Sequence, residues 1–174
     1  TGKKLTTVYI SQSDPDYYFG LDVIHAAFPE ANIVATQATI DLINASKDGK
    51  VAFWGPQLKE NAPKSVIVPQ PLKGSSFELE GHKFEVKGVD AARTFVYIPS
   101  LKAVAGGVLV NGDNMHVWTA DTQTAKSRKQ WVEALDEIAG LKPDVVVPGH
   151  FLPGAPHTLE AVKFTRNYLL TLEK

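Results

Sequence analysis

Short apolar runs alternate with helical patterns in the first part of the chain, which predicts strands and helices in turn. After Gly20, apolar side chains recur at helical spacing until Pro29 stops them, so a helix is expected there. The first 63 residues predict a strand, a helix, a strand, a helix and a long loop, at 8–10, 21–28, 32–36, 37–45 and 46–63. A loop of that length in a compact domain is either functional or a flap.

The remainder of the chain predicts a set of strands followed by two amphipathic helices. The strands are expected at 66–68, 76–79, 83–86, 94–98 and 103–110, with a hairpin turn at Glu80-Gly81-His82. The two helices are expected at 125–139 and 158–172, on either side of a buried strand at 145–147. Mixed strands with helices at both ends of the chain predict an α/β fold built as a layered sandwich.

Composition favours one globular domain that spans residues 1–174. The chain is 44% apolar and 21% charged, which is enough to bury a core without disulfides. A formal net charge of −1 without blocks of like charge argues against a nucleic-acid or membrane partner. The chain has no cysteine, which excludes thiolate zinc sites and cysteine nucleophiles and is compatible with cytoplasm or periplasm.

The most informative stretch follows the first predicted strand. Val8-Tyr9-Ile10 runs directly into a loop that holds Asp14 and Asp16, and a helix follows. Carboxylates at such a junction are costly unless they bind a cation, cap the helix or take part in chemistry. Capping, or an Asx-turn before Pro15, is therefore an alternative to a cation site.

Four blocks of sequence resemble the metallo-β-lactamase-fold hydrolases, and more narrowly a bacterial branch with a Ser-Asp-Pro-Asp-Tyr-Tyr-Phe-Gly signature. The blocks are SDPDYYFG at 13–20, FWGP at 53–56, MHVWTADTQT at 115–124 and VVPGH at 146–150. The resemblance implies the αββα sandwich of that family. It also implies that most of the N-terminal lobe is lacking, because the chain begins almost at the metal-binding loop.

The resemblance implies a ligand set in which several histidines are replaced. On the family's His-x-His-x-Asp-His pattern, Gln12 and Asp14 occupy the two leading histidine positions, Asp16 keeps the aspartate, and Tyr17 takes the last histidine. His150 matches the family's final metal histidine. The resemblance therefore implies that Asp14, Asp16 and His150 bind the metal, with Gln12 as a further candidate.

Two other ligand positions of the family carry Val89 and Gly107. Asp90 is the candidate to substitute beside Val89, and Asp113 and His116 are the candidates to substitute for the position of Gly107. His116 could instead be a packing residue, and His150 a buried hydrogen-bonding histidine. The family's usual cofactor is a divalent metal, commonly zinc. Oxygen-rich ligands with one imidazole favour a harder or weakly bound ion with partial occupancy over a tight zinc pair.

The resemblance implies metal-assisted hydrolysis of an ester, lactone, amide or phosphoester, with Asp16 orienting the attacking water. Tyr17, Trp54 and Trp118 are expected to line the pocket of this small-molecule substrate, although Trp54 is equally interpretable as a core residue. The alternative function is a non-catalytic fragment or binding module of the same fold. Because the strands at 66–110 need a second layer, we expect a homo-oligomer or association with a separated N-terminal lobe.

Overall fold

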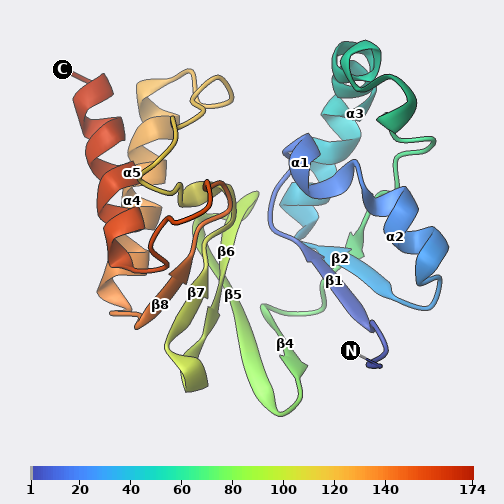
Figure 1. The fold of residues 1–174 in the computed structure, drawn as a ribbon, viewed down its shortest axis with the longest axis horizontal. Coiled ribbons are helices and arrows are strands. Elements are labelled where there is room, and N and C mark those ends of the chain that lie inside the picture. Colours follow the sequence, from blue (N-terminus) through green and yellow to red (C-terminus); the bar gives the residue numbers. More distant parts are fainter. Residues whose placement is uncertain (1) are drawn as a thin grey trace. The chain divides into compact units, whose positions relative to one another are not determined.

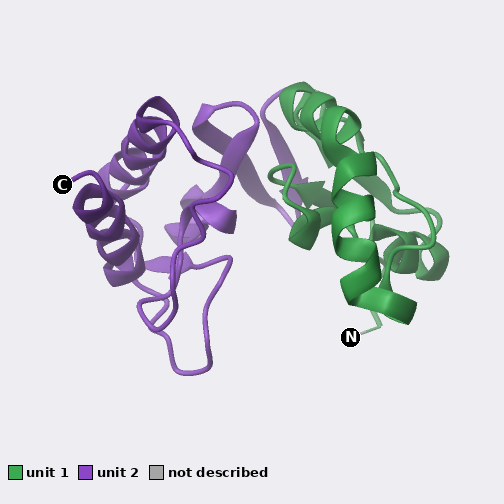
Figure 2. Ribbon diagram, turned by 90° about the horizontal axis from the view of Figure 1, so that it is seen from above, with its two compact units in different colours: residues 1–73 green, residues 74–174 purple. Residues whose placement is uncertain are grey.

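The computed structural model describes residues 2–174, which form two compact units, 2–73 and 74–174 (Figure 2). Each unit has its own sheet and its own cluster of buried apolar side chains. They are called unit 1 and unit 2 below.

Unit 1 is a three-stranded parallel sheet in the order β1-β2-β3, connected by helices (Figure 1). Its elements are β1 (Thr7–Ile10), α1 (Pro15–Tyr18), α2 (Leu21–Ala27), β2 (Asn32–Ala35), α3 (Gln37–Leu58), the 3₁₀ helix η1 (Lys59–Asn61) and β3 (Gln70–Pro71). Strands β1 and β2 pair from Thr7 with Asn32 to Ile10 with Ala35. Since parallel strands end at the same sheet edge, the loop after β1 and Thr36 after β2 leave the sheet together.

The core of unit 1 lies between this sheet and its helices. Buried side chains of the strands meet those of the three helices, namely Ile10, Ile33 and Ala35 with Tyr18, Leu21, Ile40 and Ile43. The spacing of Ile40 and Ile43 is that of one helical face, as the sequence predicts. The core therefore includes Ile10 at the end of β1 and Tyr18 at the end of α1, and the acidic loop lies between these two residues.

Helix α3 corrects the prediction of a long loop at 46–63, because the helix continues to Leu58. Ser46 stays in the helix and donates from its hydroxyl to the carbonyl of Leu42 at 2.7 Å. Gly49 lies in the helix interior and Pro56 in its last turn, so the residues that suggested a break only weaken the helix. Neither α3 nor any other helix of residues 2–174 is long and apolar enough to cross a membrane.

The segment 66–68 also differs from prediction, since it pairs with no strand. Val66, Ile67 and Val68 nevertheless pack against the core of unit 1, and the short β3 follows at Gln70. The apolar run indicates that the segment is buried. A β-strand and an extended segment without a pairing partner can both be buried, so the pattern does not distinguish them.

Unit 2 contains a five-stranded mixed sheet whose strands follow in chain order (Figure 1). Its elements are β4 (Ser76–Leu79), β5 (His82–Asp90), β6 (Arg93–Ile98), η2 (Pro99–Leu101), β7 (Ala103–Ala105), η3 (Gly107–Leu109), α4 (Ala125–Gly140), β8 (Val145–Val147) and α5 (Leu159–Leu172). Strands β4 to β7 are antiparallel neighbours, and β8 adds to β7 in parallel.

Two turns in unit 2 depend on backbone angles with positive φ. Glu80 and Gly81 have φ of 52° and 82°, which is the signature of a two-residue hairpin turn and confirms the predicted one. The strand predicted at 103–110 is too long, because β7 ends at Ala105 and Gly107, with φ of 54°, turns the chain into η3.

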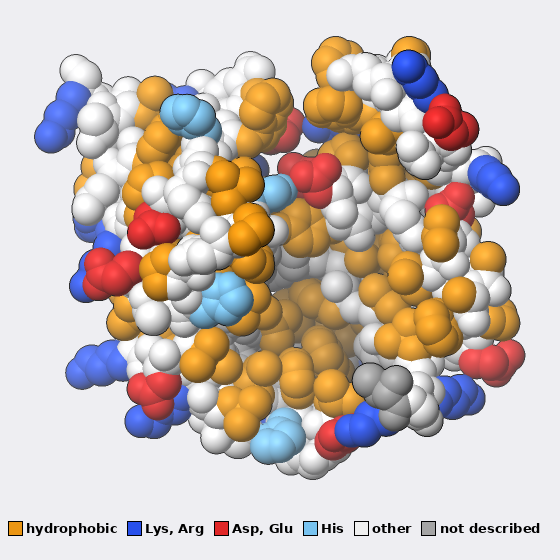
Figure 3. Space-filling model, viewed as in Figure 1, with side chains coloured by type: hydrophobic (Ala, Val, Ile, Leu, Met, Phe, Trp, Pro, Cys, Tyr) orange, Lys and Arg blue, Asp and Glu red, His pale blue; other side chains and the backbone are white. Residues whose placement is uncertain are grey.

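Helices α4 and α5 cover one face of the unit 2 sheet. Phe95, Val104 and Val146 from the strands pack there with Trp131 and Leu169 from the helices. On β8, an edge strand, Val145 and Val147 alternate with the buried Val146 and are each 40% exposed. Figure 3 shows apolar side chains, in orange, on the surface of both units.

Candidate functional site

The acidic loop of unit 1 begins where β1 ends. Asp14 is the N-cap of α1, and its Oδ1 accepts a hydrogen bond from the backbone N–H of Asp16 at 3.1 Å. Its carbonyl accepts from the N–H of Tyr17 at 3.0 Å, and Pro15 takes the first helical position. The capping interpretation of Asp14 is confirmed, and Asp16 lies exposed in the first turn.

Gln12, at the first of the replaced histidine positions, has an unusual environment. The residue is only 4% exposed, and neither its Oε1 nor its Nε2 has a hydrogen-bond partner. Leaving a buried amide unsatisfied costs roughly 1–3 kcal/mol, so native proteins rarely do so without a functional reason. Gln12 thus offers a buried donor and a buried acceptor two residues before Asp14.

Two tyrosines follow the carboxylates. Burial first, and then the charges of Asp14 and Asp16, raise the pKa of Tyr17 well above its usual range. Burial and the charge of Asp14 raise the pKa of Tyr18 to about 12, and its buried hydroxyl has no hydrogen-bond partner. The raised pKa values favour the protonated form of both phenols. The same charges favour a cation at this loop.

In unit 2, His150 follows β8 on a loop held by backbone hydrogen bonds. The N–H of Gly149 lies 3.0 Å from the carbonyls of both Gly107 and Val110, and the carbonyl of His150 accepts from Gly112 at 2.7 Å. His150 itself is half-buried and forms a parallel bridge with Asn111. The loop that follows η3 is therefore paired with the loop that carries His150.

Asp113, His116 and Trp118 lie farther along that loop, and all three are exposed. The Nδ1 of His116 lies 3.5 Å from the hydroxyl of Tyr168, and the indole N–H of Trp118 donates to Asp121 at 3.3 Å. Across residues 2–174, no three His, Asp or Glu side chains form a group that could hold a metal ion. The paired loops thus do not bring Asp113, His116 and His150 to one ion.

Trp54 lies in the C-terminal half of α3 and is half-buried. Its ring packs edge to face on the exposed Phe53, with centroids 5.0 Å apart. The role of Tyr17, Trp54 and Trp118 as pocket residues stays a prediction.

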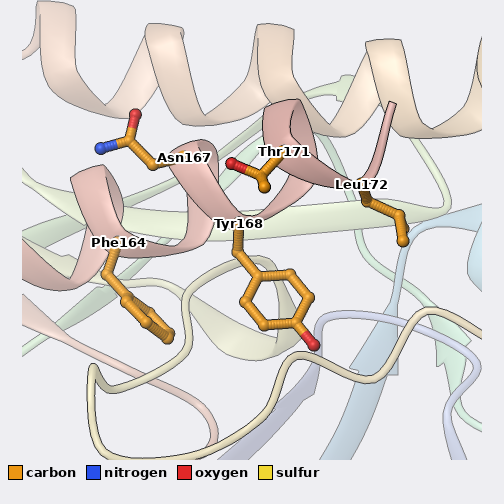
Figure 4. Close-up of a pocket in the computed structure, with 5 residues that line it drawn as sticks. All are labelled: Phe164, Asn167, Tyr168, Thr171 and Leu172. Atoms are coloured by element: carbon orange, nitrogen blue, oxygen red, sulfur yellow. The ribbon is translucent and has the colours of Figure 1, made fainter. Parts of the chain in front are cut away.

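A groove of about 470 Å³ lies along α5 in unit 2, a place that the sequence analysis did not predict (Figure 4). It is lined by Phe164, Asn167, Tyr168, Thr171 and Leu172. Phe164 and Tyr168 project from the same side of the helix, and Leu172 continues their spacing of four residues. This spacing of four residues was the only sign of the groove in the sequence. Residues that pack into a core show the same spacing, so it does not identify a groove.

The donor set of these positions can be compared with the needs of a metal. An amide oxygen, two carboxylates and one imidazole, from Gln12, Asp14, Asp16 and His150, suit a single hard ion. The unpartnered oxygen of Gln12 supports this fit. Val89 and Gly107 have no side-chain donor, so the set does not suit a tight zinc pair. Convergence of the four residues on one ion stays a prediction, since His150 belongs to unit 2 and the others to unit 1.

Comparison with known proteins separates fold from sequence. No protein-family profile and no curated protein sequence matches the chain. Among solved structures, a metallo-β-lactamase from Pontibacter korlensis superposes with a TM-score of 0.63 at 21% identity, over 95% of this chain and 69% of that one. The crystal structure of VMB-1 gives a TM-score of 0.66 at 17% identity, over 99% of this chain and 71% of that one. The chain has the metallo-β-lactamase fold.

A metallo-β-lactamase family protein from Thermus thermophilus has a similar fold, with a TM-score of 0.61 at 15% identity over 95% of this chain and 61% of that one. The predicted fold class is therefore confirmed. Identities this low establish the metallo-β-lactamase fold alone. The narrower resemblance to a bacterial branch with the SDPDYYFG signature stays a prediction.

Proposed function

We propose that this metallo-β-lactamase-fold chain is a hydrolase that uses one weakly held divalent ion. The observation that carries the proposal is the buried amide of Gln12, whose oxygen and nitrogen both lack a partner at the carboxyl end of β1. A bound ion would give the oxygen of this amide a partner, and a bound substrate would give one to its oxygen or nitrogen. Zinc is the usual ion of the family, although the oxygen-rich donors suit a harder ion equally well.

Gln12, Asp14, Asp16 and His150 would hold the ion. When bound, such an ion acidifies a water molecule and polarises a carbonyl or phosphoryl group. Asp16 is exposed in the first turn of α1 and would orient the attacking water through its carboxylate. Burial and the two carboxylates raise the pKa of Tyr17, which favours its protonated form, and its hydroxyl would donate a hydrogen bond to substrate. The substrate would be an ester, lactone, amide or phosphoester.

A second candidate function is a non-catalytic binding module for a small molecule. Two observations favour it: the carboxylate of Asp14 already caps α1, and residues 2–174 contain no group of three acidic or histidine ligands. In this case Gln12 would hydrogen-bond the small molecule directly.

Manganese broadening of NMR signals distinguishes the two functions. A shared ion should broaden, at the same low Mn²⁺ concentration, signals of residues 12–18 in unit 1 and of His150 in unit 2. Asp16→Asn should weaken both effects. Asp48→Asn, an exposed change on α3 with a side chain 93% exposed, serves as the control and should leave them unchanged. Broadening confined to unit 1 would contradict the shared ion, and none at all would favour the binding module.

Zinc stoichiometry gives a second test. Since Val89 and Gly107 supply no donor, elemental analysis after desalting is expected to find well under two zinc ions per chain. A stoichiometric pair would show that Asp113, His116 or Asp90 contributes after all.

A further inference from the structure

The two loops at 111–114 and 149–152 of unit 2 come from different parts of the chain and are bound to each other. The carbonyl of His150 accepts a hydrogen bond from Gly112 in the first loop, and the N–H of Gly149 lies 3.0 Å from the carbonyl of Val110, directly before that loop. In the sequence, these two loops are separated by α4 and β8. One side chain extends the pairing beyond the backbone bonds.

That side chain is Asn114. Its Nδ2 donates to the carbonyl of Leu152 at 3.1 Å, and its Oδ1 accepts from the N–H of Leu152 at 3.1 Å. The amide of one side chain thus satisfies both backbone groups of one residue, as a neighbouring strand would. Leu152 is 51% exposed, so its side chain contributes little packing, and its other backbone contact is the hydrogen bond from the N–H of Ala155 to its carbonyl at 3.2 Å.

The loop that carries Asn114 is itself fixed to the core. Asn111 is buried, and its N–H donates to the hydroxyl of Thr165 on α5 at 3.0 Å. The Thr165 hydroxyl lies 3.2 Å from the carbonyl of Asn111 and 2.9 Å from that of Ala161, within reach for donation. The loop that carries Asn114 is therefore anchored to α5 through the hydrogen bonds of Asn111.

Gly112 shows how closely the two loops approach. A Cβ built at Gly112 would lie 2.7 Å from the Cβ of Phe151 and 3.1 Å from the Oδ1 of Asn114. Real Cβ atoms almost never show contacts under 3.0 Å, so the approach requires glycine. The close approach allows the short hydrogen bond from Gly112 to the carbonyl of His150.

We propose that Asn114 is a positioning residue for His150. It acts through Leu152, two residues beyond the imidazole, and holds the second half of the His150 loop against the anchored loop 111–114. The consequence for metal binding rests on the proposed function, in which His150 is a ligand. A ligand held in place before the ion arrives loses less conformational entropy on binding.

The test uses Asn114→Leu, which keeps the size of the side chain and removes both hydrogen bonds. In the metal-free wild type we expect one narrow set of His150 ring signals by NMR, and in Asn114→Leu broadened or doubled signals. The Mn²⁺ concentration that half-broadens the His150 ring should rise about tenfold, which is the lower end of the effect of losing an outer hydrogen-bond partner. Asn44→Ala, an exposed change in α3, should alter neither quantity.

Hydrogen exchange of the Leu152 amide in the wild type makes the test independent of the variant's folding. Protection is expected from the bond to Asn114, and exchange at the rate of an unprotected loop would overturn the proposal. Unchanged His150 ring signals in a folded Asn114→Leu protein would overturn it as well. If Mn²⁺ leaves the wild type unchanged, the proposed function fails, while the ring signals of the metal-free protein still test the role of Asn114.

Discussion

Gln12 and Tyr18 are single residues near the end of β1 whose polar atoms are buried without hydrogen-bond partners. A sequence shows that a glutamine replaces a histidine, but whether its amide is satisfied depends on every neighbour in the fold. The capping role of Asp14 was one of the roles foreseen from its position before Pro15. Which of the foreseen roles a carboxylate takes depends on backbone geometry that the residue types alone leave open.

Replacing Gln12 by an apolar side chain of similar size should stabilise the protein. Gln12→Met removes an unsatisfied buried amide and should raise the free energy of unfolding, measured with urea, by about 1 kcal/mol. Gln57→Met, on the exposed part of α3, is the control and should change it by less than about 0.5 kcal/mol. A loss of stability in Gln12→Met would mean that the amide is satisfied in solution.

The raised pKa of Tyr18 predicts a loss of stability in alkali. The folded pKa of about 12 lies above the ordinary value of 10.0 expected when the chain unfolds. The contribution to stability is thus complete below pH 10 and is lost as the pH rises towards 12. Urea unfolding across this range measures the decline. It should be smaller in Tyr18→Phe, and an identical decline in both proteins would contradict the assignment.

At the scale of elements, strong local patterns predicted most helices and strands correctly. The amphipathic helices α4 and α5 were located within one residue or so, since their apolar stripes face a core. The misplaced elements have weak or ambiguous patterns: in α3 only Thr39, Ile40 and Ile43 are buried, so its second half has no apolar stripe. The extended segment 66–68 has a strong apolar pattern because it is buried, but it pairs with no strand.

Glycine replacement tests the interpretation of α3. A Cβ at Gly49 would meet no atom within 4 Å, so Gly49→Ala should stabilise the protein by about 0.5–1 kcal/mol through helix propensity. Gly88→Ala is the contrasting variant, because Gly88 has φ of 142° and its Cβ would lie 2.8 Å from the carbonyl of Arg93. It should destabilise. Thermal unfolding compares the two, and a destabilised Gly49→Ala would argue against a helix there.

At the scale of the whole molecule, the exposed side of β8 bears on association. Val145 and Val147 point away from the core of unit 2 on an edge strand, and each is 40% exposed. The N–H of Val146 between them is already bonded to the carbonyl of His157 at 3.1 Å, so it is the exposed apolar side chains that favour association with another chain. Self-association, or binding of a separate N-terminal lobe, therefore remains our proposal for the partner of this protein.

Light scattering under native conditions tests this. We expect a mass above the 18.9 kDa of one chain, and a shift towards that value in Val147→Lys. Val23→Lys, which changes a residue of α2 that is 68% exposed, is the matched control and should leave the mass unchanged. A monodisperse wild type near 18.9 kDa with no second polypeptide on a gel would contradict the proposal.

The sequence by itself determined the fold class and the chemical character of the candidate site. Burial patterns with periods of two and 3.6 residues are local properties, and the blocks around Asp16 and His150 can be recognised without coordinates. Only the tertiary structure decided that the amide of Gln12 is buried without a hydrogen-bond partner and that the amide of Asn114 is hydrogen-bonded to Leu152 on the loop of His150. Both depend on contacts between residues distant in the chain, which local pattern does not specify.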